Sequence, residues 1–234
     1  MNARTVLLWG DVGAGKTSLL ATALLGPGAH ARLPMIDWPA SLPAIQDALL
    51  PAWERLTNGL LTVPTTALPQ PVVVRLTDGT EVSFQDIMGE RARRPDGTVR
   101  ELLGRTSAVL FVMGWGATGR RRQFEAIRTA LPALGSRPRA LAFTRCEQAL
   151  RNGHPAWAPG GETSGWWADH PGWEPEEADT LRQIGTVWPT SAYGFDGNGN
   201  PACVLDEFGE LVPYNIRPAN GTALLGWLLG RVSV

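Results

Sequence analysis

Gly10-Asp11-Val12-Gly13-Ala14-Gly15-Lys16-Thr17 is the stretch that decides how the rest of this chain is interpreted. It fits the pattern G-x-x-x-x-G-K-[ST], in which the backbone N–H groups of a glycine-rich loop surround phosphate oxygens. Lys16 is the only lysine in a chain with 21 lysine and arginine residues together. A compact ammonium on a flexible stem can reach over a tight loop and contact two phosphates, whereas a planar guanidinium fits there less easily. The stretch therefore predicts a phosphate-binding loop, here called the 10–17 loop.

The residues on either side of the 10–17 loop supply the strand and the helix that the motif requires. Residues 4–9 are apolar and partly β-branched, which predicts a strand, and residues 17–25 predict a helix that ends at Gly26-Pro27. The start of a helix carries partial positive charge, which favours phosphate. We expect Lys16 to bridge the terminal phosphates of a nucleoside triphosphate, and the Thr17 hydroxyl to coordinate Mg²⁺.

A chain of 234 residues can form one large α/β domain or two small ones, and its apolar fraction of 44% is ordinary for a globular core. We predict a single domain spanning residues 1–234. The net charge of −1 gives no field that would direct the chain to nucleic acid or to a membrane. Cys146 and Cys203 are too few for a disulfide scaffold. We find no signal peptide, membrane-spanning stretch or lipid anchor, and we expect a cytoplasmic protein.

Strands that alternate with helices predict a doubly wound α/β sheet. Residues 72–76 and 80–84 flank Asp78-Gly79, which is a strong two-residue hairpin turn. We predict a three-layer sandwich of the P-loop NTPase type, with helices on both faces of a mostly parallel six-stranded sheet that contains this one antiparallel hairpin. The other predicted elements are strands at 108–113, 139–143 and 187–188, and helices at 44–56, 123–134 and 221–231.

Three further motifs follow strand ends, where doubly wound sheets bind their ligands. Asp86-Ile87-Met88-Gly89 follows the hairpin directly and fits D-x-x-G. Thr144-Arg145-Cys146-Glu147 follows the strand at 139–143, and Thr190-Ser191-Ala192 follows the last strand. The sequence therefore predicts that these three segments lie beside the 10–17 loop.

This layout resembles the Ras-like small GTPases of the translation-factor (TRAFAC) class, and it is most similar to the bacterial branch related to double-GTPase domains. The resemblance covers essentially the whole chain. It implies that Asp86 holds a magnesium-bound water and that the Gly89 N–H contacts the γ-phosphate. Either Thr65 or Thr66 would be the threonine of switch I, at about 57–70, that closes over Mg²⁺ and the γ-phosphate. Switch II would cover about 86–105.

The resemblance also assigns a base-reading role to two segments, with departures from the family pattern. Thr144–Glu147 stands where the family has Asn/Thr-Lys-x-Asp, and Ser191-Ala192 stands where the backbone contacts the guanine oxygen. Glu147 is one methylene longer than the aspartate that binds guanine, and Arg145 replaces the lysine. Paired hydrogen bonds of this kind can discriminate strongly, so the selectivity for guanine over adenine stays open.

Glu90 stands where Ras-like proteins often carry the glutamine that positions water. A carboxylate facing the γ-phosphate needs a compensating cation, so we expect slow hydrolysis without a partner, or another residue that orients the water. Arginines near Glu90 could supply such a cation, although we favour a solvated loop for this run. They are Arg91, Arg93, Arg94, Arg100 and Arg105.

The complete set of expected site residues divides by role. The residues expected to bind the nucleotide are Gly10, Asp11, Val12, Gly13, Ala14, Gly15, Lys16, Thr17, Ser18, Thr144, Arg145, Glu147, Ser191 and Ala192. The expected metal ligands are Thr17, Asp86 and either Thr65 or Thr66. The residues expected to assist the reaction are Lys16, Thr66, Gly89 and Glu90. A Trp/Gly/Pro-rich insertion at about 148–178 holds Trp157, Trp166, Trp167 and Trp173, which predicts either a small core or a lid or partner surface near the base.

We therefore expect a GTP-binding molecular switch that uses Mg²⁺, hydrolyses GTP to GDP and phosphate, and works with an effector or activating protein. No nucleic acid partner is expected. Three alternatives remain: a binding module of the same fold with little or no hydrolysis, an ATP-using P-loop enzyme, and an interaction scaffold with an inert pocket. Relative affinities for GTP and ATP, together with phosphate release, would separate them.

Overall fold

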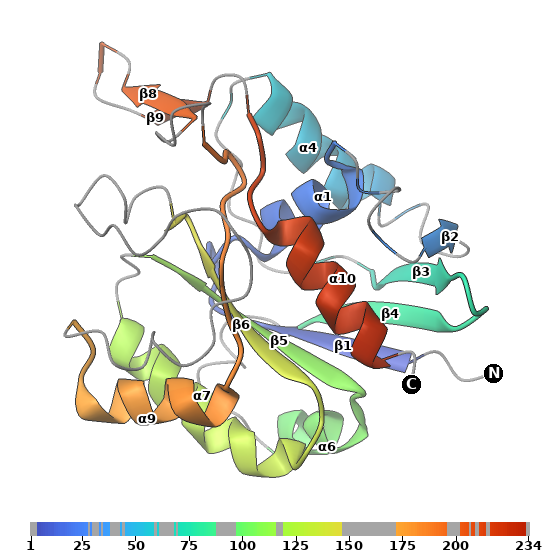
Figure 1. Ribbon diagram of the computed structural model, residues 1–234, viewed down its shortest axis with the longest axis vertical. Helices are drawn as coiled ribbons and strands as arrows, with labels where there is room; N and C mark the ends of the chain where they lie inside the picture. The colour runs from blue at the N-terminus through green and yellow to red at the C-terminus, as the bar shows by residue number, and fades with distance from the viewer. Residues whose placement is uncertain are drawn as a thin grey trace.

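A computed structural model of the chain contains a central sheet whose strands are β1 (Arg4–Trp9), β2 (Met35–Asp37), β3 (Val72–Leu76), β4 (Glu81–Asp86), β5 (Ala108–Gly114), β6 (Arg139–Thr144) and β7 (Val187–Pro189). Their order across the sheet is β2-β3-β4-β1-β5-β6-β7 (Figure 1). β1 pairs in parallel with β4 and β5, and β5, β6 and β7 continue the parallel arrangement. β3 pairs antiparallel with β4, and β2 pairs antiparallel with β3.

The structure describes most, but not all, of the chain. The described residues are 4–27, 29, 33, 35–37, 43, 45–58, 60, 68, 70–87, 97–115, 119–146, 172–195, 202–205, 207–208, 211–213 and 216–232.

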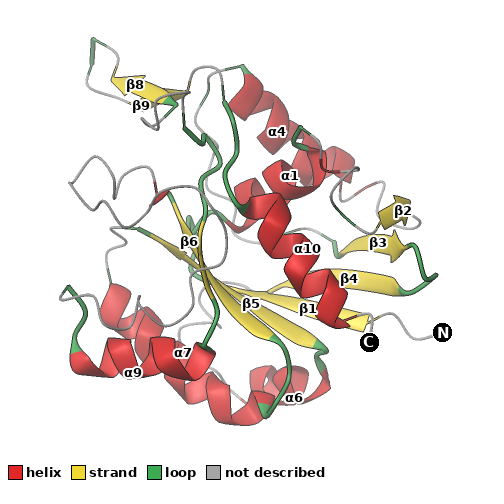
Figure 2. Ribbon diagram, viewed as in Figure 1, coloured by secondary structure: helices red, strands yellow, loops and turns green. Residues whose placement is uncertain are grey.

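Helices cover both faces of the sheet, so the fold has three layers (Figure 2). The helical elements are the π-helical turn η1 (Ile45–Leu49) and the α-helices α1 (Lys16–Leu25), α4 (Leu50–Thr57), α6 (Gly97–Arg105), α7 (Arg120–Leu134), α9 (Pro175–Ile184) and α10 (Gly221–Val232). Alternation along β1 divides the core: Val6 and Leu8 pack with α1, α4 and α10, whereas Leu7 and Trp9 pack with α6, α7 and α9.

The six predicted strands, the antiparallel hairpin and the predicted helices are all present, with shifts of a few residues at their ends. The sheet extends one strand beyond the prediction, because the three-residue β2 adds to the edge beside β3. A separate two-stranded hairpin, β8 (Cys203–Leu205) with β9 (Leu211–Pro213), was also not predicted. It projects from the upper end of the molecule, away from the central sheet (Figure 1).

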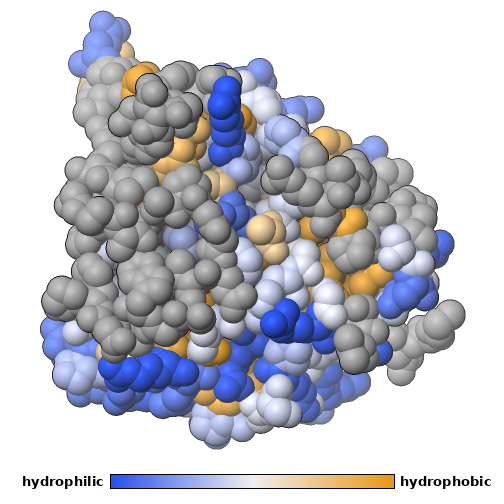
Figure 3. Space-filling view, viewed as in Figure 1, coloured by the Kyte–Doolittle hydropathy of each residue, from blue (hydrophilic) through white to orange (hydrophobic). Residues whose placement is uncertain are grey.

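The prediction of a solvated loop around the arginines that follow Glu90 is wrong in part, because residues 97–105 form the helix α6. Arg100 and Arg105 lie on this helix, exposed to solvent, while Val99 and Leu103 are buried four residues apart on its inner face. Figure 3 shows hydrophilic residues across the lower part of the molecule, where α6, α7 and α9 lie. Within the described residues, no helix combines the length and the apolarity needed to cross a bilayer.

Candidate functional site

The 10–17 loop joins the carboxyl end of β1 to the start of α1, in the middle of the sheet (Figure 1). Since β4, β5 and β6 run parallel with β1, their carboxyl ends reach the same edge. Asp86 ends β4 and Thr144 ends β6. The fold therefore brings three separately predicted segments together, as expected for the carboxyl edge of a doubly wound sheet.

Two glycines let the 10–17 loop pass close to neighbouring strands. A side chain at Gly10 would overlap the backbone carbonyl of Val112 on β5. Gly15 has a φ of 90°, in the left-handed region, and its α-hydrogen faces Thr144 so closely that a Cβ would lie 3.2 Å from the threonine hydroxyl. The backbone of the loop is thus packed directly against β5 and β6.

Lys16 folds back over the loop that precedes it. Its Nζ donates hydrogen bonds to the carbonyl oxygens of Gly10, at 2.6 Å, and Asp11, at 3.0 Å. The same Nζ lies 3.5 Å from Asp86 Oδ1, and the two side chains are only 4% and 1% exposed. Asp86 Oδ2 accepts a hydrogen bond from the Leu68 N–H, but Oδ1 has no hydrogen-bond partner among the described residues.

Burial outweighs attraction in this charge pair. Burial raises the pKa of Asp86 to about 6, and the nearby Lys16 charge offsets only part of that rise. Burial likewise lowers the pKa of Lys16, although Asp86 and Asp11 act in the opposite direction. An ion pair at 3.5 Å thus leaves both charges poorly compensated. An anion at Lys16 and a cation at Asp86 would each stabilise the charged forms.

The donor set suits a divalent cation that brings most of its own ligands. Among the described residues, no cluster of three or more acidic, histidine or cysteine side chains could hold a metal by itself. The Asp86 oxygen without a hydrogen bond in the described part of the chain, and the buried hydroxyl residue Thr17 at the start of α1, fit Mg²⁺, which binds through one or two protein ligands, waters and substrate phosphates. Ser18, half-buried, completes the first turn of this helix.

The segment after β6 contacts the backbone of the 10–17 loop. The Thr144 hydroxyl donates to the Ala14 carbonyl at 2.6 Å. Arg145, whose φ of 60° is unusual for a residue other than glycine, donates from Nη2 to the Gly13 carbonyl at 2.8 Å. Both residues were expected to contact the base. In the structure, both donate hydrogen bonds to the backbone of the 10–17 loop.

The predicted Ser191-Ala192 segment lies beside this one. The Cys146 N–H donates to the Thr190 carbonyl at 3.1 Å, which joins the two strand-end segments. Ser191 is buried, its N–H donates to the Ala219 carbonyl, and its hydroxyl accepts a hydrogen bond from the Gly194 N–H at 2.8 Å. The serine side chain therefore shapes the turn at 191–194, and Ala192 next to it is half-buried.

Two side-chain contacts made by α7 were not predicted, and one of them reaches the 10–17 loop. Gln123 donates from Nε2 to Asp11 Oδ2 at 3.0 Å. Arg120 bonds Glu177 Oε1 on α9 at 3.0 Å and stacks over Trp173 at 4.9 Å. A polar Gln123 on the apolar face of the predicted helix was the one available signal.

Trp173 is half-buried and packs against the core of this region. It stacks on Phe143 of β6, with ring centroids 5.4 Å apart and an interplanar angle of 17°, and it meets Trp115 and Phe124 edge-on. Of the two interpretations given to the tryptophan-rich insertion, this residue follows the small-core one. Trp157, Trp166 and Trp167 lie outside the described residues.

Other predicted site residues also lie outside the described part of the chain: Thr65, Thr66, Gly89, Glu90 and Glu147, together with Arg91, Arg93 and Arg94. Their roles stay predictions. No protein-family model matches the chain, and no curated protein is similar enough in sequence to count as a relative. The functional assignment therefore depends on the residues and the geometry of the site.

Proposed function

We propose that this protein is a Ras-like, GTP-binding molecular switch with a P-loop NTPase fold, which hydrolyses GTP slowly with Mg²⁺. The observation that carries the proposal is the placement of Lys16 over the 10–17 loop, facing the buried carboxylate of Asp86. In this proposal the Lys16 ammonium would bind the phosphate chain, and the Asp86 carboxylate would bind the Mg²⁺ that accompanies it.

Each described group has a role in this proposal. The loop N–H groups and the start of α1 would bind phosphate oxygens, and Lys16 would turn from carbonyl oxygens to phosphate. Thr17 and Asp86 would hold Mg²⁺, directly or through water, and the metal would neutralise charge on the phosphates. Arg145 and the 190–192 segment would border the base, since Arg145 contacts the loop and the 190–192 segment is bonded to the residue that follows Arg145.

A contact between the two proposed switches supports the choice of a switch. The Leu68 N–H, in the predicted switch I, donates to Asp86 Oδ2 at 3.2 Å at the start of the predicted switch II. A cation at Asp86 would compete with this hydrogen bond for the carboxylate. Binding of Mg²⁺ and nucleotide would therefore weaken the hydrogen bond between the two segments, and a partner protein could recognise the resulting change in conformation.

Calorimetric titration of nucleotide-free protein with GTP, GDP and ATP, each with Mg²⁺, tests the proposal. We expect guanine nucleotides to bind more tightly than ATP, Lys16→Ala to abolish binding, and exposed Arg128→Ala on α7 to serve as the matched loss of a cation. Phosphate release should be slow. Tighter binding of ATP would favour an ATP-using enzyme, whereas binding without release, even with a partner, would favour a non-hydrolysing module. Absence of any nucleotide binding would refute the proposal.

A further inference from the structure

A buried carboxylate lies inside the 10–17 loop, next to the place where an anion is proposed to bind. Asp11 is only 8% exposed, and its carbonyl oxygen is one of the two that hold Lys16 Nζ. The charge of Asp11 also acts on Lys16, where it favours the protonated amine. A carboxylate at this position can therefore compete with phosphate for the same lysine, and it repels phosphate directly.

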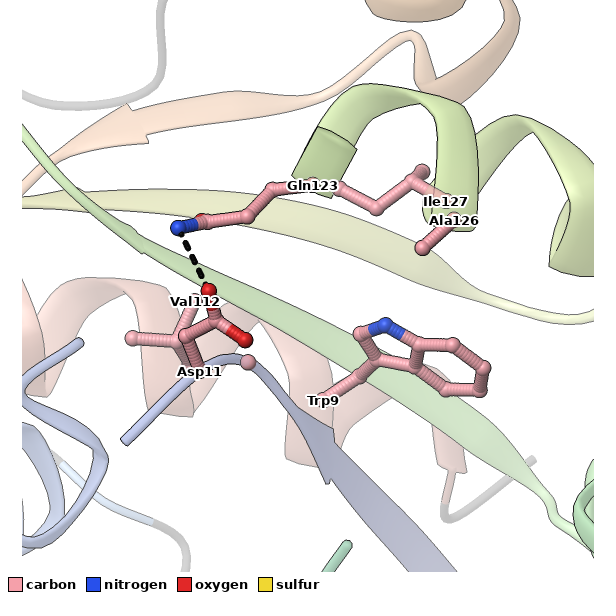
Figure 4. Close-up of a pocket in the computed structure, with 7 residues that line it drawn as sticks. Trp9, Asp11, Val112, Gln123, Ala126 and Ile127 are labelled. Carbon is pink, nitrogen blue, oxygen red and sulfur yellow. Dashed lines mark hydrogen bonds between the residues drawn. The ribbon is translucent and has the colours of Figure 1, made fainter. Parts of the chain in front are cut away.

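The side chain of Asp11 is directed away from this conflict, toward α7. Its Oδ2 accepts a hydrogen bond from Gln123 Nε2 at 3.0 Å, and Gln123 is itself 8% exposed (Figure 4). A carboxylate can only accept, so the amide must present its NH₂ group, which fixes the orientation of the glutamine. This bond links residues that are 112 positions apart in the chain.

The surroundings make Gln123 the natural holder of this carboxylate. Asp11 and Gln123 line a small pocket of about 10 Å³, the size of one water molecule, whose other walls are apolar or glycine. These walls are Trp9, Gly10, Val112, Ala126 and Ile127. Figure 4 shows Gln123 reaching from α7 to Asp11 across this space. If the amide were removed, the carboxylate would lose the polar donor on the side of this pocket, and a turn toward Lys16 would bring it closer to a cation.

We propose that Gln123 is a positioning residue of the phosphate site, whose amide holds the Asp11 carboxylate on the α7 side and leaves Lys16 available for the anion. The proposal rests on the function proposed above, since it assumes that the 10–17 loop binds phosphate. Gln123 contacts neither the nucleotide nor the metal in this account, and it acts only through Asp11.

Four variants and one matched control test this inference by calorimetry with Mg²⁺·GDP and Mg²⁺·GTP. Gln123→Leu keeps the size of the side chain and removes its amide, and we expect binding to weaken about tenfold, the loss of one hydrogen bond to a charged group. Gln123→Glu places a second carboxylate beside Asp11 and should weaken binding further. Asp11→Asn/Gln123→Leu, compared with Asp11→Asn, should differ by less than about twofold, because there is no charge left to hold. Gln183→Leu, exposed on α9, is the control.

A purely structural role for Gln123 would give a different pattern. Gln123→Leu would then lower stability without a specific loss of affinity, or it would weaken binding equally in the wild-type background and in the Asp11→Asn background. Either result overturns the inference. Urea unfolding of each variant separates the two roles.

The sole lysine supplies a readout that needs no nucleotide. With ¹³C-labelled lysine the protein has one lysine Cε resonance, that of Lys16, and we expect it to shift at fixed pH in Gln123→Leu but not between Asp11→Asn and Asp11→Asn/Gln123→Leu. If the wild type bound no nucleotide, the proposed function would fail. This resonance would still decide the inference, because an unchanged signal in Gln123→Leu overturns it and a shift that depends on Asp11 supports it.

Discussion

The variant Thr144→Val should show whether Thr144 stabilises the 10–17 loop or recognises the base. It removes the hydroxyl of this residue and changes the shape of the side chain very little. That hydroxyl is buried and donates to the Ala14 carbonyl at 2.6 Å. Valine preserves the branched shape that packs against Gly15, so the variant removes a donor without opening a cavity. Leaving a buried carbonyl without its donor costs about 1–3 kcal/mol. For a chain of this size, about 2 kcal/mol corresponds to a fall in Tm of about 4–8 °C.

The binding consequence follows from where the hydroxyl points. Since Thr144 contacts the loop backbone, its loss should weaken GTP, GDP and ATP by similar factors and leave the GTP-to-ATP ratio within about twofold. Urea unfolding measures the stability change, and calorimetry measures the three affinities. Thr129→Val is the matched control, because the Thr129 hydroxyl is exposed and bonds only within α7, to the Glu125 carbonyl. The control should change stability by less than about 0.5 kcal/mol.

A change in the GTP-to-ATP ratio with unchanged stability would refute this reasoning. Thr144 would then read the base, as the sequence pattern suggested, and the hydrogen bond to Ala14 would contribute little. A loss of stability with unchanged nucleotide affinity would refute the prediction that the Thr144 bond supports binding. The conformation of the 10–17 loop that binds nucleotide would then be independent of β6.

Three further changes have expected outcomes that follow from single contacts. Gly10→Ala drives a methyl group into the Val112 carbonyl, so we expect a loss of about 1–3 kcal/mol in urea unfolding together with loss of nucleotide binding. Asp86 holds its proton to a higher pH in the native state than in the unfolded chain, so the stability present at acidic pH is lost as the pH rises from about 4 through about 6. The shift of the pKa from 3.8 to about 6 should make the stability of the wild type relative to Asp86→Asn fall by about 2 kcal/mol between pH 4 and pH 7 in urea titrations. Arg120→Ala leaves the buried Glu177 carboxylate without its charged partner and should cost about 1–3 kcal/mol in thermal unfolding, whereas a neutral result would show that the pair is already solvated.

The fold was predictable where the pattern is local. The hairpin of β3 and β4 alternates regularly around Asp78-Gly79, and the buried strand β5 is apolar throughout. β2 and α6 were missed for physical reasons. A three-residue edge strand has too little sequence for any period, and α6 buries only Val99 and Leu103 among polar residues, so its helical period is short and weak.

The residues of the candidate site were likewise predictable only where their pattern is local in the sequence. The 10–17 loop and Asp86 carry motifs whose members are close in sequence, so their spacing was enough to propose them as site residues that lie together. The bonds from Thr144 to Ala14 and from Gln123 to Asp11 join residues 130 and 112 positions apart. Such contacts depend on the order of the strands and on which side of the sheet α7 packs, and the local pattern determines neither.

The arrangement of Lys16 also explains how the site can be both buried and ready for a ligand. A close, charge-assisted pair with Asp86 would lie at about 2.7–2.9 Å and would have to be broken before phosphate or metal could bind. The ion pair here is longer, at 3.5 Å, and two backbone carbonyls accept two of the three ammonium protons of the lysine without neutralising its charge. An anion then needs to displace only neutral acceptors, and a cation meets a carboxylate oxygen that has no hydrogen bond among the described residues. Burial shifts the pKa of each group toward its neutral form, and in the proposed function a phosphate and a divalent cation that bind together would relieve this uncompensated burial.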